Sequence, residues 1–242
     1  MTDSPPGENW EERPAFLDTD VSVWETQTGR INLGVAVNSN AGLQGTAVLE
    51  ENNFDLFKPP KSFQDVVDGV AWRGGGQQFR VEAMPGTQLS RYLVSWRDPF
   101  FLERNLSFGV SGYYQTRVFP NWWQKNAGGR VDIGRQFTVN TSGSLALRAE
   151  NVNISNVSTP TPPVIEEVLG NNFLTTIKGT LVHDTRDNAF LPGSGHYARF
   201  DYEQGFGNFV YPKFDVEYKQ YFLVHERPDG GSRQVVSVVG QF

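Results

Sequence analysis

The densest group of potentially reactive side chains lies in one short segment of the chain. Asp184, Arg186 and Asp187 fall within four consecutive positions, and His183 comes directly before them. Two carboxylates this close together can hold a metal ion or share a proton in acid–base catalysis. Charged residues at a turn more often form a local ion pair and bond to the backbone of the turn itself. The sequence favours this second interpretation.

The other groups that could perform catalysis or bind a ligand are weaker. His183, His196 and His225 are too scattered for a zinc site or a catalytic triad, and the absence of cysteine excludes disulfides and thiol chemistry. Gly74 to Gly76 is not followed by the Lys-Ser/Thr of a phosphate-binding loop. A net charge of −6 without a basic cluster argues against nucleic-acid binding. We therefore expect neither an enzyme nor a cofactor, a metal ion or a nucleic-acid partner.

The segment that contains these residues has the pattern of β-strands. Phe173, Ile177 and Leu181 share one face and polar side chains occupy the other, which is the period of two that strands show. The same alternation recurs from Gly29 to Phe242 and predicts about eleven antiparallel strands, with no long helix. The first hairpin pairs a strand over Arg30 to Val37 with a strand over Leu43 to Glu50.

Three connections interrupt this pattern for longer than a turn. The first, Asn52 to Gln77, includes a short predicted helix that Ser62 caps and that carries Asp65 in its first turn. We expect the other two long loops over Thr116 to Gly128 and over Ser155 to Asn172. Compact turns separate these loops, and outer-membrane barrels also alternate short turns with long loops.

Two all-β architectures fit the alternation of apolar and charged residues. A soluble sandwich packs its apolar face against a second sheet, whereas a transmembrane barrel turns that face toward lipid and the charged face toward a wet lumen. Aromatic residues make up 13% of the chain and hydrophobic residues only 38%, a balance typical of outer-membrane barrels. No run of 18 apolar residues is present, which excludes a transmembrane helix. The pattern alone leaves both architectures open.

Three separated motifs resemble one family of barrels. The turn that begins at Asp184 and ends at Gly195, the strand from Tyr92 to Phe101 with its Asp-Pro-Phe-Phe ending, and the opening hairpin from Gly29 to Glu50 occur in the family's order. Together they resemble the bacterial surface-antigen barrels of the outer membrane, and most strongly the barrel subunit of the β-barrel assembly machine. The turn residues that carry the resemblance are Asp184, Arg186, Asp187, Pro192, Gly193 and Gly195.

The resemblance implies an antiparallel transmembrane β-barrel of which this chain supplies a part. The family's barrel has sixteen strands, and the residues from 29 to 242 would form about the first eleven. Residues 1–28 are polar and rich in proline, so we expect a linker from missing periplasmic domains. That segment has no apolar core, so we expect no signal peptide in it.

The resemblance also implies a function in the outer membrane. Such a barrel inserts and folds other β-barrel proteins without a cofactor, and its first strand acts as a lateral gate that templates an incoming strand. Its partners would be the lipid bilayer, unfolded β-barrel substrate proteins and accessory periplasmic lipoproteins. The alternatives are a secretion pore for one partner protein and a soluble β-sandwich binding module. The predicted gate strand consists of Arg30, Ile31, Asn32, Leu33, Gly34, Val35, Ala36 and Val37.

Overall fold

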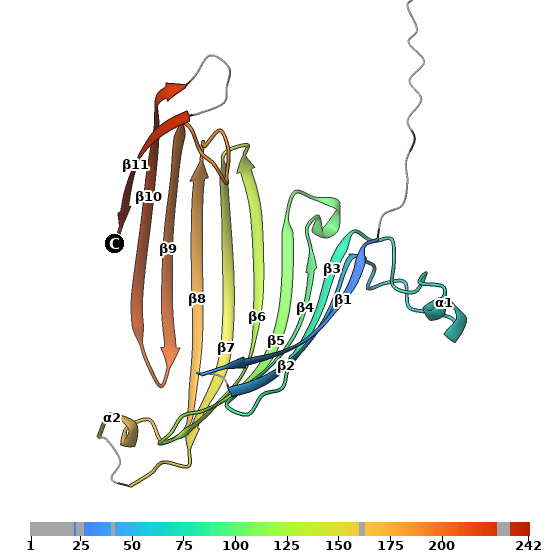
Figure 1. Ribbon diagram of the computed structural model, residues 1–242, viewed down its shortest axis with the longest axis vertical. Coiled ribbons are helices and arrows are strands. Elements are labelled where there is room, and N and C mark those ends of the chain that lie inside the picture. Colours follow the sequence, from blue (N-terminus) through green and yellow to red (C-terminus); the bar gives the residue numbers. More distant parts are fainter. Residues whose placement is uncertain (1–21, 23–26, 40–41, 160–162, 227–232) are drawn as a thin grey trace, which may run out of the picture.

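The computed structural model describes residue 22 and residues 27–39, 42–159, 163–226 and 233–242. It forms one antiparallel sheet in which each strand pairs with the next one along the chain, from β1 to β11 (Figure 1). The prediction of about eleven antiparallel strands is therefore confirmed. The strands are β1 (Gly29–Asn38), β2 (Gly42–Phe54), β3 (Gln77–Met84), β4 (Leu89–Asp98), β5 (Ser107–Val118), β6 (Trp123–Thr138), β7 (Thr141–Ser155), β8 (Gly170–Asp184), β9 (Gly195–Gly207), β10 (Tyr211–Glu226) and β11 (Arg233–Gln241).

Short helices occur only in the connections of the described chain. Helix α1 (Phe63–Val67) lies between β2 and β3, and Ser62 caps it as expected: the N–H of Asp65 donates to Ser62 Oγ at 3.3 Å, and the N–H of Ser62 donates to Asp65 Oδ2 at 3.1 Å. Helix α2 (Pro163–Glu166) lies between β7 and β8, and a 3-10 turn covers Phe101–Glu103. Within the described ranges, no helix has the length and apolar character needed to cross a membrane.

The sheet curls along its width and has two distinct ends. Because neighbouring strands are antiparallel, the β2–β3, β4–β5, β6–β7 and β8–β9 connections all lie at the end that carries α1, the α1 end. The β7–β8 connection with α2 lies at the opposite end, the α2 end (Figure 1). Strands β1 and β11 are the two edges of the sheet and do not pair with each other.

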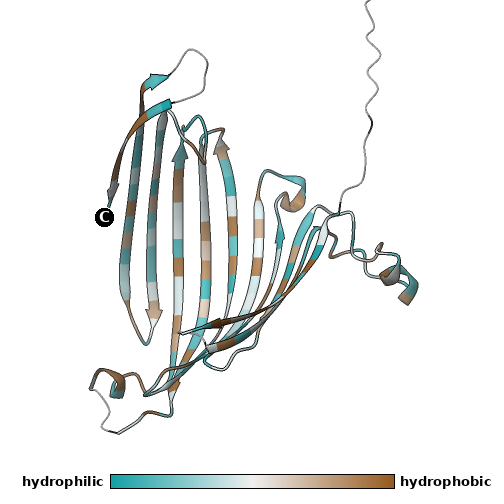
Figure 2. Ribbon diagram, in the orientation of Figure 1, coloured by the Kyte–Doolittle hydropathy of each residue, from teal (hydrophilic) through white to brown (hydrophobic). Residues whose placement is uncertain are grey.

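Apolar and polar side chains occupy opposite faces of the sheet. Brown and teal bands alternate along the strands in Figure 2, as the period of two predicts. The polar face is the sheltered one: Glu82 is 6% exposed and Thr176 is 2% exposed, whereas Leu33 on the apolar face is 78% exposed. A soluble protein buries its apolar face instead. The reversed arrangement is that of a membrane barrel with a polar interior.

Ion pairs of two kinds cover the polar face. Some join neighbouring strands, such as Lys178 on β8, which lies 3.4 Å from Asp201 on β9. Many of the pairs, however, join residues two apart on one strand, such as Arg80 with Glu82 at 2.8 Å. Side chains at i and i+2 share a face of a strand, so long basic side chains can bend along it.

The predicted long loop over Thr116 to Gly128 is wrong. Strand β5 continues to Val118 and β6 begins at Trp123, so a short turn joins them. The other two long connections are confirmed, since β2 ends at Phe54 and β8 begins at Gly170. Almost all of the predicted linker, residues 1–28, lies outside the described residues.

Candidate functional site

The predicted gate strand forms an edge of the sheet. Strand β1 pairs with β2 over its full length, from Gly29 opposite Glu51 to Asn38 opposite Gly42. Within the described chain it has no second strand neighbour, and all of its residues are exposed. An edge strand presents backbone N–H and C=O groups that can pair with another chain. The structure thus places Arg30 to Val37 at an edge of the described sheet.

A series of ion pairs connects β1 to β2, β3 and β4. Arg30 forms an ion pair with Glu50 on β2, and Glu50 also pairs with Arg80 on β3. Arg80 Nη2 lies 2.8 Å from Glu82 Oε2, and Arg91 Nε on β4 lies 3.5 Å from Glu82 Oε1. This network holds only the α1 end of β1, because Arg30 is its second residue.

The middle of β1 has small residues and an open polar face. Gly34 lies opposite Thr46, and Val35 lies opposite Gly45. A Cβ atom added to Gly34 would meet no atom within 4 Å, so crowding does not explain this glycine. Gly29 differs, because its added Cβ would lie 2.5 Å from Glu51 Oε2. Since glycine weakens a strand, Gly34 lowers the stability of β1 where nothing in the described structure requires it.

The second predicted set of residues forms the connection between β8 and β9 at the α1 end. Arg186 donates two hydrogen bonds to the carboxylate of Asp184, from Nε at 2.8 Å and from Nη2 at 2.7 Å. Its guanidinium also lies 4.8 Å from the ring centre of Tyr197 on β9. The hydrogen bonds to Asp184 raise the pKa of Arg186, so this pair stays charged. Arg186 thus joins the two strands across their turn.

Asp187 closes the same turn through backbone hydrogen bonds. Its Oδ1 accepts from the N–H groups of Asn188 at 2.9 Å, Gly193 at 2.8 Å and Ser194 at 3.1 Å. The N–H donors of Ser194 and Gly193 lower the pKa of Asp187 below its usual value of 3.8. Pro192, directly before Gly193 in the sequence, is half buried. The carboxylate therefore already accepts hydrogen bonds from backbone N–H groups of its own turn.

Gly195 meets a strict steric requirement at the start of β9. Its φ is +94°, and an added Cβ would overlap the carbonyl oxygen of Thr185. Only glycine fits such a position without strain. The turn residues therefore act together to hold the β8–β9 turn in one conformation. The described residues contain no group of three or more acidic, His or Cys side chains that could hold a metal ion.

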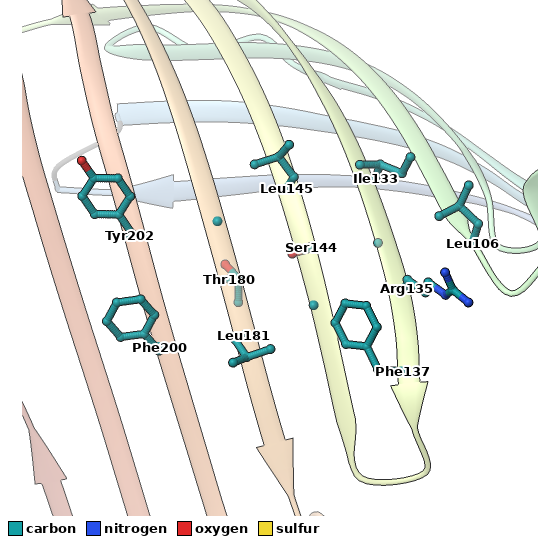
Figure 3. A pocket seen from close by; sticks show the side chains of 13 residues that line it. Leu106, Ile133, Arg135, Phe137, Ser144, Leu145, Thr180, Leu181, Phe200 and Tyr202 are labelled. Carbon is teal, nitrogen blue, oxygen red and sulfur yellow. The ribbon is translucent and has the colours of Figure 1, made fainter.

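The two predicted sets do not come together in the structure. Strand β1 is the first strand of the sheet, whereas the turn joins the eighth and ninth strands. What sequence reasoning missed is a groove of about 480 Å³ on the apolar face of β6 to β9, with Arg135 on its border (Figure 3). The sequence does contain a signal for this groove, because Arg135 interrupts the apolar series of Val131, Ile133 and Phe137 on β6.

Comparisons with known proteins agree with this architecture. The fold resembles the crystal structure of BamA from Haemophilus ducreyi lacking POTRA domains 1-3, with a TM-score of 0.59 and 17% sequence identity. The similarity covers 83% of this chain and 38% of the chain of that structure, so this chain spans less than half of its length. No curated protein matches the chain significantly.

The family model for the Omp85 superfamily domain matches residues 72–240, more than half of the chain. The matched region covers β3 to β10 and nearly all of β11, including the turn that contains Asp184 and Gly195. The reversed placement of polar and apolar residues fits the outer membrane, where barrels of this superfamily lie. The chain belongs to the Omp85 superfamily and forms part of an outer-membrane β-barrel.

Proposed function

We propose that this protein assembles β-barrel proteins and inserts them into the outer membrane, with β1 as a lateral gate and template. The proposal rests most directly on the state of β1. Its residues Arg30 to Val37 are exposed throughout, and the strand has one neighbour among the described strands. A strand of an unfolded substrate could add to this edge through backbone hydrogen bonds, as in β-augmentation.

The sequence of β1 supports a pairing that can be exchanged. Ile31, Leu33, Val35 and Val37 give the strand an apolar face for the lipid, so it is compatible with the membrane when it is unpaired on one side. Gly34 weakens the middle of the strand without a steric cause. Backbone hydrogen bonds do not depend on the identity of the side chains, which suits a template for many different barrels.

The proposed partners are the lipid bilayer and unfolded β-barrel proteins, and accessory periplasmic lipoproteins remain a prediction. The proposed step needs no enzyme chemistry and no cofactor, because strand pairing and burial in lipid drive insertion. A secretion pore for one partner protein is the second candidate. The charged polar face favours it, since pairs such as Lys178 with Asp201 would line a wet lumen.

Insertion by the full-length protein in lipid vesicles tests the proposal. The measurement is the rate at which several unrelated unfolded barrels become protected from protease. We expect faster protection than in empty vesicles, and we expect Gly34→Ile to slow it, because the added side chain stiffens the gate strand. Gly112→Ile is the control: Gly112 also has open space around its Cβ position, but it lies on β5 inside the sheet and on the apolar face, whereas Gly34 lies on the polar face.

The outcomes separate the two candidate functions. Acceleration for several substrates, with Gly34→Ile slower than Gly112→Ile, supports an assembly factor with β1 as its gate. Equal effects of the two variants would contradict the role of β1. No acceleration, together with ion conductance and export of a single protein, would replace the assembly factor with a secretion pore.

A further inference from the structure

The apolar face of the sheet contains a groove across β6 to β9. Gly179 on β8 forms its open floor, because an added Cβ there would meet no atom within 4 Å. Gly143 on β7 also lines the groove, but the ring of Phe137 covers it, with Cε2 2.6 Å from the position of an added Cβ. Leu145, Leu181 and Phe200 stand around it on the viewer's side of the sheet in Figure 3, whereas Thr180 points behind the sheet. A volume of about 480 Å³ lies within the usual size of a ligand site.

One charged side chain borders this apolar groove. Arg135 on β6 shares its face with Ile133 and Phe137 and reaches toward Leu106 (Figure 3). It forms no side-chain hydrogen bond or ion pair with any residue that the structure describes. Arg130, on the polar face of the same strand, lies 3.6 Å from Asp132. A cation on a lipid-facing surface is costly unless it has an anionic partner or reaches the interface.

The position of Arg135 identifies the kind of partner. It lies three residues before the end of β6, roughly 10 Å along the strand from the β6–β7 turn at the α1 end. In a membrane barrel, a residue this close to a strand end lies nearer to the headgroups than to the bilayer centre. The groove extends from Phe137, which lies nearer the turn than Arg135, to Ile133 and Leu145, which lie farther from it. An anionic head and an apolar chain would thus meet Arg135 and the groove, respectively.

We propose that this groove binds an anionic glycerophospholipid, with the phosphate at Arg135 and an acyl chain over Gly179. Guanidinium groups bind phosphate oxygens through paired, charge-assisted hydrogen bonds. The apolar side chains around the groove contact one acyl chain and hold it against the protein. The proposal goes beyond protein insertion and depends only on the location of the sheet in the outer membrane.

Native mass spectrometry of the full-length protein in detergent tests this site. The probes are phosphatidylglycerol, a diacylglycerol with the same two chains, and inorganic phosphate. The variants are Arg135→Gln, which removes the cation, and Gly179→Leu, which fills the floor of the groove. Their controls are Arg130→Gln on the polar face and Gly112→Leu, which fills an apolar groove on β3 to β5 that no basic residue lines.

We expect phosphatidylglycerol to bind about tenfold more weakly to Arg135→Gln and to Gly179→Leu, and both control variants to bind like the parent protein. Diacylglycerol should bind weakly and show no dependence on Arg135. Equal binding to Arg135→Gln and Arg130→Gln would overturn the phosphate site. Equal binding to Gly179→Leu and Gly112→Leu would overturn the chain site. Displacement of phosphatidylglycerol by millimolar phosphate would show an anion site without lipid specificity, which also contradicts the proposal.

Discussion

The carboxylate of Asp187 accepts a hydrogen bond of 2.8 Å from the backbone N–H of Gly193, six residues farther along the chain. This bond and the bonds from Asn188 and Ser194 close the β8–β9 connection around one side chain. Glycine at position 193 lets the carboxylate approach, because an added Cβ would lie 2.9 Å from Asp187 Oδ2. The order of this turn therefore depends on an ionised Asp187.

The first prediction concerns the pH dependence of this turn. The pKa of Asp187 is lowered below 3.8 in the folded protein, so its contribution is complete above that pH and disappears as pH falls through the lower folded value. We expect hydrogen-exchange protection of the Gly193 and Ser194 amides to fall in that acidic range. Asp187→Asn should lower their protection at neutral pH and remove the acid-dependent step. An unchanged acid profile in Asp187→Asn would contradict the assignment.

The second prediction concerns the backbone at Gly195. Gly195→Ala should destabilise the protein by more than about 2 kcal/mol, because it adds overlap with the Thr185 carbonyl oxygen to the cost of a positive φ. Gly170→Ala is the control, since Gly170 has a φ of +86° and open space around its Cβ position. We expect that control to cost about 1 kcal/mol. Urea unfolding midpoints in vesicles measure the difference, and equal costs would rule out the predicted overlap.

The third prediction concerns the ion-pair network that joins β1 to β2, β3 and β4. Glu82 is sheltered and faces Arg80 at 2.8 Å and Arg91 at 3.5 Å. Glu82→Gln should destabilise the sheet by about 1–2 kcal/mol, because Arg91 loses its anion and Arg80 keeps only Glu50. Glu226→Gln, which breaks the more exposed 2.7 Å pair with Arg233, should leave the urea midpoint unchanged. A larger effect from Glu226→Gln would show that the burial of these ion pairs does not determine how much they stabilise the sheet.

Much of the fold could be predicted from the sequence because strand alternation and helix capping are local signals. The first hairpin and the Ser62 cap lie where the sequence predicts them. The predicted loop over Thr116 to Gly128 failed because Gly128 and Gly129 resemble a turn. An added Cβ at Gly128 would lie 2.7 Å from Glu150 Cβ and 2.9 Å from the Tyr113 hydroxyl. That glycine gives space to side chains from neighbouring strands, which the local sequence does not reveal.

The candidate sites were predictable to different degrees. The turn from Asp184 to Gly195 could be found because its residues are adjacent in sequence and their turn chemistry is local. The groove beside Arg135 could not, since its walls come from separate strands and depend on their register. The only signal of this groove in the sequence is one charged residue in the apolar series of β6.

Disulfide trapping tests the central claim, that β1 templates a substrate strand, most directly. The chain contains no cysteine, so a single cysteine at Leu33 reports without background from this region. It would be combined with single cysteines placed in turn along one strand of an unfolded barrel substrate. Directly opposed residues of antiparallel strands lie within disulfide range, so only a matching register can form the bond.

We predict one strong cross-link for Leu33→Cys, and for Val35→Cys a cross-link shifted by two substrate residues in the antiparallel direction. Leu147→Cys on β7, which has strand neighbours on both sides, should form none. Cross-linking that is equal at Leu33→Cys and Leu147→Cys, or that shows no register, would contradict the template role of β1.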